Sequence, residues 1–489
     1  MSEEPAAEII SLGARVAQLA AERGERPAVT DHLRSVTWGE LHRRTNRIAR
    51  GLEKAGVKQG DLVTIGLPNS VDFVEACYAL WKVGATPQPI SYRLPAVEAK
   101  AVMELAETPI LIGPESLASD RPRFDIPALL ALRDDDSDLE DRTAPIWKAP
   151  TSGGSTGRPK LILSGGPGVF NPALPGGYRS APDDIMLQPG PLYHNGPFTS
   201  SFGGLNQGAH LIVMPRFDAE ETLRLIERHK ATWIYTVPTM MSRIWRLPEE
   251  VRTGHDVSSL QTLWHLAAPC PPWLKEAFIH WLGPDVIMEL YAGTEAQAVT
   301  IITGTEWLEH RGSVGKVAVG EMAAFDADGR QLPPGETGEV YMRRPPGLPP
   351  SYSYRGATPR TLPGGWESLG DIGWFDEDGY LYLADRRTDM ILVGGSNVYP
   401  AEIESALDEH PLVQSSAAIG LPDEEMGATI HAIVQPRPGL TEADLREHLR
   451  TRLVTYKQPR TYEFVEENIR DDAGKVRRSQ LREERLAKR

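Results

Sequence analysis

The chain has 489 residues, of which 40% are hydrophobic and 24% charged, and its formal net charge is −15. This composition is typical of a globular protein of two or three domains, and the acidic balance argues against general nucleic-acid binding. No apolar run is long enough to span a membrane, and the acidic start of the chain is unlike a secretory signal, so we expect a cytoplasmic protein. Cys77 and Cys270 lie far apart in the sequence, as expected of free thiols in a reducing compartment.

Helices and strands alternate through the first 290 or so residues. Apolar residues have helical spacing over 9–22, and the segment from Thr37 to Glu40 reads as a helix N-cap and first turn. Further segments are predicted as strands at 62–67, 85–90, 184–187, 209–214, 232–237, 263–266 and 286–289, and as helices at 71–83 and 219–229, after Pro238 and up to Trp281. This alternation predicts a parallel sheet covered by helices, in which ligands bind at the carboxyl ends of the strands.

From about residue 312 the pattern changes. Short alternating runs at 323–326, 338–342 and 379–383 predict an antiparallel, barrel-like region, and the segment 344–363, dense in Pro and Gly, is interpreted as a surface loop. The chain then returns to mixed elements, with strands predicted at 390–393, 414–420 and 428–435 and helices at 400–408 and 442–450.

These segments together predict an α/β multidomain fold. We expect a large domain over 1–386 built of parallel and mixed sheets covered by helices, with a β-barrel-like part over about 312–386. A hinge at 387–389 and a small, mobile α+β C-terminal domain over 390–489 would complete the chain, and about a hundred residues is an ordinary domain size.

A segment rich in glycine and hydroxyl groups reads Thr151-Ser152-Gly153-Gly154-Ser155-Thr156-Gly157-Arg158-Pro159-Lys160. Glycines let a backbone turn sharply and approach a ligand, and successive N–H groups in such a turn bind anions. Hydroxyl groups and the cations Arg158 and Lys160 add donors and positive charge. The segment therefore predicts a phosphate site, although it lacks the Gly-Lys-Ser/Thr ending of a Walker A loop. A flexible polar linker is the less favoured interpretation, because the segment runs on into Pro-Lys and apolar residues.

Four further motifs carry residue types suited to nucleotide chemistry. Tyr291-Ala292-Gly293-Thr294-Glu295 follows a predicted strand, and a carboxylate beside a phosphate site makes sense mainly with a divalent cation between them. Asp371 is of the type that binds a sugar diol, and Lys475 in the basic tail can stabilise charge on a reacting carboxylate and phosphate. His194 follows a predicted strand. Each motif alone would more often be a turn, a structural histidine or a solvated side chain.

In this order, the motifs resemble those of the adenylate-forming superfamily, which includes acyl-CoA synthetases, luciferases and the adenylation domains of peptide synthetases. The stretch 385–404 resembles the junction of the large and small domains of that superfamily over some twenty residues. The amino-acid sequences of segments 267–272 and 291–295 are similar to those of bacterial fatty-acid and bile-acid CoA ligases. The resemblance covers nearly the whole chain.

The resemblance implies an acyl-CoA ligase that uses ATP, Mg²⁺ and coenzyme A. A hydrophobic carboxylic acid would attack the α-phosphate of Mg·ATP to give an acyl-adenylate and pyrophosphate, and the thiol of CoA would then displace AMP. The small domain would rotate between these steps, so that Lys475 faces the site in one state and Gly395 in the other.

The same resemblance implies roles for individual residues. The catalytic group would be Lys475, Glu295, His194, Thr156 and Lys160, with Glu295 holding Mg²⁺ and His194 gating access of the acyl group and the thiol. The cofactor-binding group would be Thr151, Ser152, Gly153, Gly154, Ser155, Gly157, Ala267, Ala268, Pro269, Tyr291, Ala292, Gly293, Thr294, Asp371, Arg386, Gly394 and Gly395. Within it, Tyr291 would stack on adenine and Thr294 would bond a phosphate. The ribose would be bonded by Asp371 and Arg386, and the pantetheine arm of CoA would pass Gly394 and Gly395.

Three features depart from the superfamily pattern. Asp471-Asp472 precede the Gly-Lys pair, Thr388 occupies the hinge position, and Ala296 stands where glycine is common. Two carboxylates near Lys475 would oppose a triphosphate, which would favour an enzyme that mainly converts a supplied acyl-adenylate into the thioester. An adenylation enzyme that loads a carrier protein and a non-enzymatic nucleotide-binding scaffold are also compatible with these motifs. The sequence does not determine whether the acid is fatty, aryl or polycyclic, or whether the protein forms a homodimer.

Overall fold

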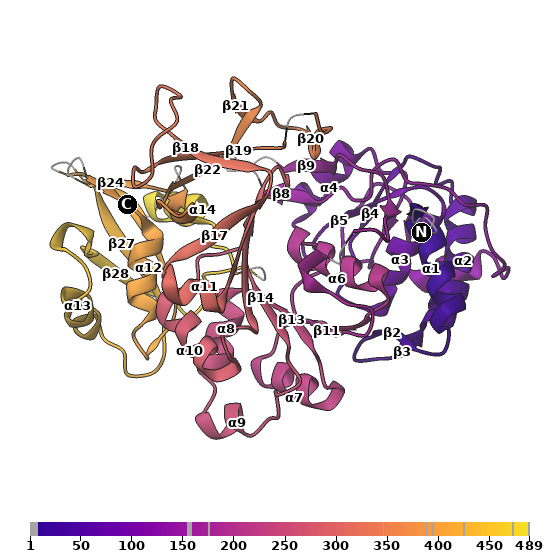
Figure 1. The fold of residues 1–489 in the computed structure, drawn as a ribbon, viewed down its shortest axis with the longest axis horizontal. Coiled ribbons are helices and arrows are strands. Elements are labelled where there is room, and N and C mark those ends of the chain that lie inside the picture. Colours follow the sequence, from indigo (N-terminus) through magenta and orange to yellow (C-terminus); the bar gives the residue numbers. More distant parts are fainter. Residues whose placement is uncertain are drawn as a thin grey trace, which may run out of the picture.

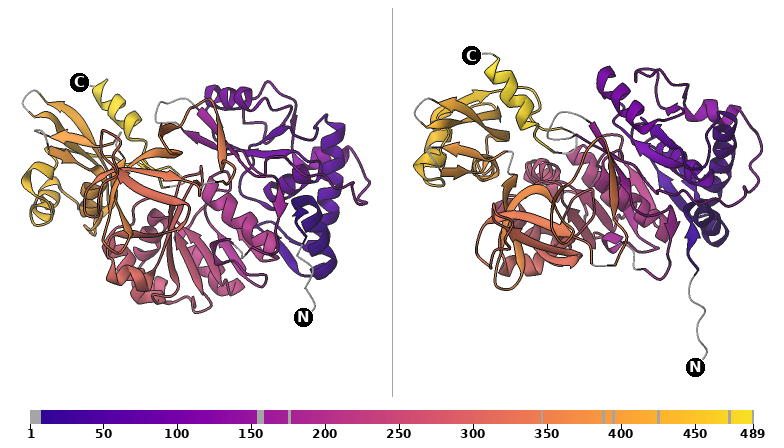
Figure 2. Two further views of the ribbon diagram at one scale, coloured as in Figure 1. Left: turned by 45° about the horizontal axis from the view of Figure 1, so that its top comes forward. Right: turned by 90° about the horizontal axis from the view of Figure 1, so that it is seen from above.

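A computed structural model of the protein describes residues 8–153, 159–174, 177–345, 347–386, 389–393, 396–423, 426–471 and 474–487. The N-terminal and C-terminal parts lie at opposite ends of the molecule, with the largest sheet between them (Figure 1). Figure 2 shows the C-terminal part, coloured orange to yellow, as a separate lobe in both further views.

The centre of the large sheet is parallel, as the alternation of helices and strands predicted. In spatial order its parallel strands are β2 (Pro27–Thr30), β12 (His210–Val213), β11 (Ile185–Gln188), β13 (Trp233–Thr236), β14 (Thr262–His265) and β15 (Ile287–Ala292), with β3 (Ser35–Thr37) antiparallel at the edge. Every residue of β13 and β14 is buried, since helices cover both faces of the sheet, which accounts for their continuous apolar runs.

Antiparallel strands continue the same sheet beyond β15. They are β16 (Val299–Thr303), β17 (Ser313–Val319), β23 (Tyr380–Arg386), β22 (Trp366–Phe375), β19 (Gly338–Arg343) and β18 (Glu321–Phe325), with β21 (Arg360–Leu362) on β22. The antiparallel pairing was predicted. The described pairings run from β15 outward and end at β18, so this region is an open extension of the sheet rather than a closed barrel.

Smaller sheets complete the large domain. A parallel sheet contains β5 (Thr86–Pro89), β4 (Leu62–Ile65), β6 (Leu111–Ile112) and β7 (Arg123–Phe124), an antiparallel one contains β20 (Tyr352–Arg355), β9 (Pro159–Ser164) and β8 (Thr151–Gly153), and β1 (Ile10–Ser11) pairs with β10 (Val169–Phe170). The interpretation of 344–363 as a surface loop was therefore wrong in part, because β20 and β21 lie within it. The partner of β20 is distant in sequence, so local composition concealed the strand.

Several helices of the large domain begin at side-chain caps. The predicted N-cap Thr37 and Glu40 form a capping box at the start of α2, and Ser70 accepts from Phe73 at the start of α3. The helices are α1 (Leu12–Arg23), α2 (Trp38–Lys54), α3 (Val71–Lys82), α4 (Ala96–Ala106), α5 (Ile126–Ala131), α6 (Asn195–Gln207), α7 (Ala219–His229), α8 (Pro238–Trp245), α9 (Glu249–Thr253), α10 (Pro272–Leu282) and α11 (Gly304–Glu309).

The C-terminal part has its own sheet and its own core. Its elements are β24 (Ile391–Val393), β25 (Ser396–Val398), α12 (Pro400–Asp408), β26 (Val413–Asp423), β27 (Gly427–Pro436), α13 (Glu442–Arg450), β28 (Thr461–Phe464) and α14 (Arg478–Leu486). Buried residues of these elements, such as Ile403, Ile430 and Leu445, pack together in one cluster. In the described part of the chain, no helix combines the length and the apolar character that crossing a bilayer requires.

Candidate active site

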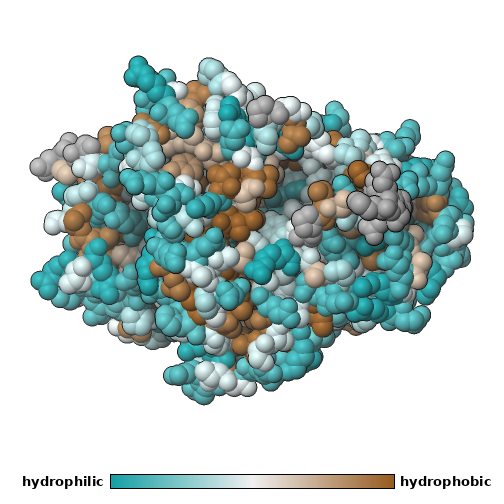
Figure 3. All heavy atoms as spheres, viewed as in Figure 1, coloured by the Kyte–Doolittle hydropathy of each residue, from teal (hydrophilic) through white to brown (hydrophobic). Residues whose placement is uncertain are grey.

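A cavity of about 2660 Å³ lies between the carboxyl ends of the parallel strands, α6, α8 and the C-terminal part. On the face shown in Figure 3, apolar side chains gather around a hollow at its centre. The predicted site residues that line the cavity are Thr151, Lys160, His194, Ala267, Ala268, Pro269, Tyr291, Ala292, Gly293, Thr294, Glu295, Asp371 and Lys475. Residues far apart in the sequence thus meet in one place.

The other predicted positions are described only in part or not at all. The backbone of Ser152 and Gly153 lies in β8 and that of Arg386 ends β23, where Arg386 pairs with Asp371. The side chains of these residues, together with Gly154, Ser155, Thr156, Gly157, Thr388, Gly394, Gly395 and Asp472, lie outside the described residues.

Glu295 and Lys160 form the polar centre of the site. Lys160 Nζ lies 3.2 Å from Glu295 Oε1, so the segment after the phosphate loop contacts the pentapeptide 291–295. Tyr354 of β20 joins them: its hydroxyl donates to Glu295 Oε1, and Lys160 Nζ lies 3.1 Å from that hydroxyl and 4.2 Å from the ring centroid. Burial, and then the bond to Glu295, raise the pKa of Tyr354 well above its usual range. The phenol therefore stays a donor that fixes the carboxylate.

The backbone around Glu295 depends on small residues. A Cβ on Gly293 would lie 2.8 Å from Glu295 Oε2 and 2.3 Å from Leu369 Cδ1, so a side chain at this position would displace the carboxylate. Ala296 has φ 55° and Ala267 has φ 75°, a left-handed conformation that costs an alanine about 1 kcal/mol. Glycine, which the resemblance leads us to expect at this position, would relieve that strain at Ala296.

Tyr291 and Asp371 meet on the other side of the pentapeptide. The Tyr291 hydroxyl donates to Asp371 Oδ2 at 2.6 Å, and Asp371 is only 8% exposed. Asp371 is thus a buried carboxylate in strand β22 rather than a solvated residue of a hairpin turn.

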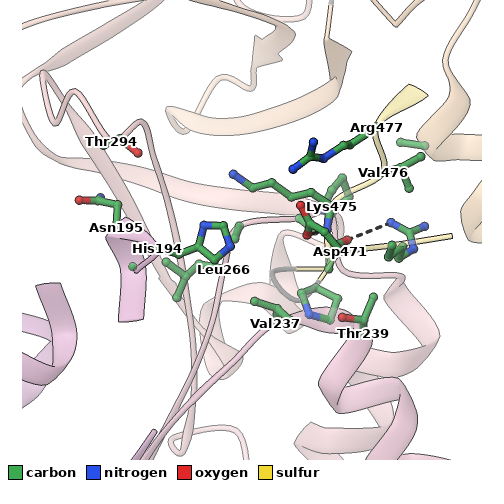
Figure 4. A pocket seen from close by; sticks show the side chains of 18 of the residues that line it. His194, Asn195, Val237, Thr239, Leu266, Thr294, Asp471, Lys475, Val476 and Arg477 are labelled. Atoms are coloured by element: carbon green, nitrogen blue, oxygen red, sulfur yellow. Dashed lines mark hydrogen bonds between the residues drawn. The ribbon is translucent and has the colours of Figure 1, made fainter. Parts of the chain in front are cut away.

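His194 and Lys475 face the same part of the cavity from opposite sides. His194 is the N-cap residue of α6, and its own side chain does not cap the helix. Figure 4 shows the Lys475 side chain extending from the C-terminal part toward His194 and Thr294. A cation, an imidazole and a hydroxyl are therefore available around one point of the cavity.

The turn that carries Lys475 is held by Asp471. The Lys475 N–H donates to Asp471 Oδ1 at 2.9 Å, and the Gly474 N–H donates to the Asp471 carbonyl at 2.8 Å. Gly474 has φ 77°, and a Cβ there would lie 2.6 Å from Thr239 Oγ1 of α8. The turn therefore packs directly against the large domain, and Asp471 has a structural partner in the backbone.

Ion pairs hold the C-terminal part together, and Arg246 links it to the large domain. Glu404 is 4% exposed and accepts from Arg478 at 2.9 Å and from Arg470 at 3.2 Å, and Arg478 also bonds Asp389 at 2.7 Å. These bonds tie α12, α14 and the start of the Lys475 turn to Asp389, the last residue of the predicted hinge. From the large domain, the Arg246 guanidinium donates to the carbonyls of Asp408, at 2.8 Å, and Val413.

Sequence reasoning missed two residues of the cavity wall, Tyr354 and Lys148. The alternating Tyr352-Ser353-Tyr354 within the supposed loop was a weak strand signal. Lys148 gave none: it is 7% exposed, its ammonium donates to Asn195 Oδ1, and it lies 4.8 Å from the Trp147 ring centroid. Burial lowers the pKa of Lys148 to about 7.

Comparison with known proteins identifies the family. Residues 16–352 match the sequence profile of AMP-binding enzymes, and residues 402–475 match that of the AMP-binding enzyme C-terminal domain. A feruloyl-CoA synthase from an Amycolatopsis species is 32% identical over 92% of this chain and 94% of its own length, and a fatty acid–[acyl-carrier-protein] ligase from Streptomyces coeruleorubidus is 30% identical over 94% and 93%.

Solved structures agree with the predicted fold class. The o-succinylbenzoate CoA synthetase from Bacillus subtilis, in complex with its acyl-adenylate intermediate, superimposes with a TM-score of 0.82 at 25% identity, covering 97% of this chain and 98% of the other. The α/β multidomain fold is thereby confirmed. The chain belongs to the family of AMP-binding enzymes, the adenylate-forming superfamily that its motifs resemble.

Proposed function

We propose that this protein is an AMP-forming acyl-CoA ligase. It would make an acyl-adenylate from a hydrophobic carboxylic acid and Mg·ATP, and then transfer the acyl group to the thiol of CoA. The observation that carries this proposal is that Lys475 enters from the C-terminal part into the same cavity as Glu295, Lys160 and His194. The related feruloyl-CoA and o-succinylbenzoate CoA enzymes are named for this chemistry.

The described residues fit a magnesium nucleotide. Glu295 offers hard carboxylate oxygens beside Lys160, and in the described part of the chain no group of three or more His, Cys, Asp or Glu could hold a metal by itself. Glu295 would thus bind Mg²⁺ together with phosphate oxygens. The ion would neutralise charge on the phosphates, which Lys160 and the adjoining loop would bind. Tyr354 would hold the Glu295 carboxylate in the orientation that the ion requires.

In the first half-reaction a carboxylate oxygen of the acid attacks the α-phosphorus, and pyrophosphate leaves. We propose that the Lys475 ammonium stabilises the negative charge shared by the carboxylate and the α-phosphate, as a preorganised cation does in a site shielded from water. Tyr291 would lie along the adenine, and Asp371 would accept from the ribose hydroxyls. The packing of Gly474 on Thr239 supports this proposal, because it holds the Lys475 turn against the large domain.

In the second half-reaction the thiol sulfur attacks the acyl carbonyl carbon, and AMP leaves with the bonding electrons. The C-terminal part would rotate, releasing the Arg246 bonds and bringing the 394–395 segment to the cavity. His194, at the start of α6, would separate the acyl path from the thiol path. We propose that the protein lies in the cytoplasm, where ATP and CoA are available. That it forms a homodimer stays a prediction, which a light-scattering measurement of its mass would test.

The hydrogen bond that Asp471 accepts from the Lys475 N–H gives this carboxylate a structural role in the turn, so its presence there is compatible with a full ligase. A carrier protein as the thiol is the second candidate, since one relative is named as a carrier-protein ligase.

Pyrophosphate release with a panel of acids, followed by thioester formation with CoA or a carrier protein, distinguishes these candidate functions. Lys475→Ala should slow pyrophosphate release about 100-fold or more while sparing thioester formation from a supplied acyl-adenylate. Turnover of acyl-adenylate and CoA without any pyrophosphate release from ATP would refute the full ligase. Failure of both reactions with every acid would leave only a nucleotide-binding scaffold.

A further inference from the structure

Lys148 lies in the wall of the cavity. Its carbonyl accepts from the Ser164 N–H at 3.1 Å, so the segment before β8 continues the pairing with β9. Alternate residues of these strands face opposite ways. Ala149, Leu161 and Leu163 pack in the core behind the sheet, whereas Lys148, Ile162 and Ser164 line the cavity.

The ammonium of Lys148 has few partners. Among the residues that the structure describes, its one hydrogen bond goes to Asn195 Oδ1. The Glu295 carboxylate forms no ion pair with it but raises the pKa of Lys148, against the larger effect of burial. The helix that begins at Asn195 has no acidic residue in its first turn, and its N-terminus is itself a positive end. A buried cation in such surroundings destabilises the free protein.

Two other buried lysines have either more hydrogen-bond partners than Lys148 or a carboxylate in direct contact. Lys82 Nζ bonds Asn46 Oδ1 at 2.5 Å and the Nδ1 and carbonyl oxygen of His42 at 2.9 and 3.0 Å. Lys275 Nζ bonds Glu289 Oε2 at 2.5 Å and lies 4.9 Å from the Trp307 ring centroid. An ammonium has three N–H donors, so Lys148 keeps donor capacity for a group inside the cavity.

That group is distinct from the reacting carboxylate. The proposed reaction centre lies where Lys475 and His194 face each other, and in Figure 4 the Asn195 side chain points away from Lys475, on the far side of His194. The oxygen that completes the surroundings of Lys148 thus belongs to another part of the bound molecule.

We propose that Lys148 and Asn195 bind an acceptor oxygen that the acyl substrate carries in addition to its reacting carboxylate, so that the preferred acids are keto acids or dicarboxylic acids rather than plain alkanoates. This inference rests on the proposed function, since it takes a carboxylic acid as the ligand. Lys148 is then a specificity-determining residue: its ammonium supplies the charge, and the Asn195 carboxamide orients it.

Matched pairs of acids test the proposal by isothermal titration without ATP. The probes are octanoate with octanedioate, octanoate with 7-oxooctanoate, and 4-phenylbutanoate with 4-oxo-4-phenylbutanoate. We expect the wild-type protein to bind the oxygen-bearing acid of at least one pair about tenfold or more tightly than its mate. Lys148→Met should weaken binding of that acid about 10- to 100-fold and change its mate less than threefold.

The matched control is Lys82→Met, which removes a buried lysine away from the cavity and should leave the preference unchanged. The inference is overturned if the wild-type protein shows no preference in any pair, if the preference survives Lys148→Met, or if Lys148→Met weakens both acids of a pair equally or weakens binding of ATP instead. Because the readout is binding, these outcomes are separate from the pyrophosphate assay, whose failure would refute the proposed function.

Discussion

Replacing Lys148 with methionine should stabilise the ligand-free protein at neutral pH, and the gain should disappear as the pH rises. Methionine fills nearly the same volume and carries no charge. Burial lowers the pKa of Lys148 from its ordinary 10.5 to about 7, a difference that corresponds to about 5 kcal/mol at most. Loss of the bond to Asn195 lowers the free energy of unfolding by about 1 kcal/mol. The substitution should therefore raise the free energy of unfolding by roughly 3–4 kcal/mol at most.

The sign of the pH dependence follows from proton binding. Between pH 7 and 10.5 the unfolded chain binds more protons at Lys148 than the folded protein does, so wild-type stability rises with pH across this window. Below pH 7 the wild-type protein bears the full cost of the buried charge. The difference in Tm between Lys148→Met and wild type should therefore be positive and largest at or below pH 7, and should shrink toward pH 10.

Thermal unfolding of the ligand-free proteins from pH 6 to 10 measures this difference. For a chain of this length, a gain of roughly 3–4 kcal/mol corresponds to a Tm shift of several degrees. Burial also lowers the pKa of Lys82 to about 7, so Lys82→Met should show a gain of the same sign and pH dependence, reduced by the loss of its bonds to Asn46 and His42. A wild-type protein more stable than Lys148→Met at pH 7, or a difference that does not change with pH, would refute the reasoning.

Three further predictions concern the site and its supports. Tyr354→Phe removes the hydroxyl bond to Glu295 and should lower kcat/KM for pyrophosphate release about tenfold, with a raised Mg²⁺ requirement; an unchanged Mg²⁺ titration would contradict this role. Gly474→Ala places a Cβ 2.6 Å from Thr239 Oγ1, so pyrophosphate release should fall more than thioester formation from a supplied acyl-adenylate, and equal losses would argue against docking of this turn in the first step. Glu404→Gln removes the buried charge shared by two partly buried arginines and should destabilise the C-terminal part by about 3 kcal/mol. The change should appear as an earlier thermal transition, and an unchanged melting curve would contradict it.

The sequence was most informative where the signal was local. Many strands and helices of the parallel sheet from Leu62 onward were found from apolar periodicity, and α12 and α13 coincide with their predicted ranges, whereas α4 and β16 were not predicted. The resemblance indicated that Tyr291, Asp371 and Lys475 belong to one site, and the described side chains line one cavity. These features depend on short patterns that the sequence carries directly.

Features that depend on distant contacts were not predictable in this way. Tyr354 reaches Lys160 across 194 positions of sequence, and the composition of its segment favoured a loop. The burial of Lys148 depends on α6, which begins at Asn195, and a lone lysine carries no sign of burial. Asp471 looked unfavourable beside Lys475 because the backbone bond that it accepts is visible only in the folded turn.

The hydrogen bonds of Arg246 would have to break before the C-terminal part could rotate. Both of its acceptors on the C-terminal part are main-chain carbonyls, those of Asp408 and Val413, so no side-chain change there can remove them. Arg246 is the large-domain half of both bonds, so a substitution there would weaken this contact without touching a residue of the proposed chemistry, and under the proposed mechanism it would change the rate of the domain movement.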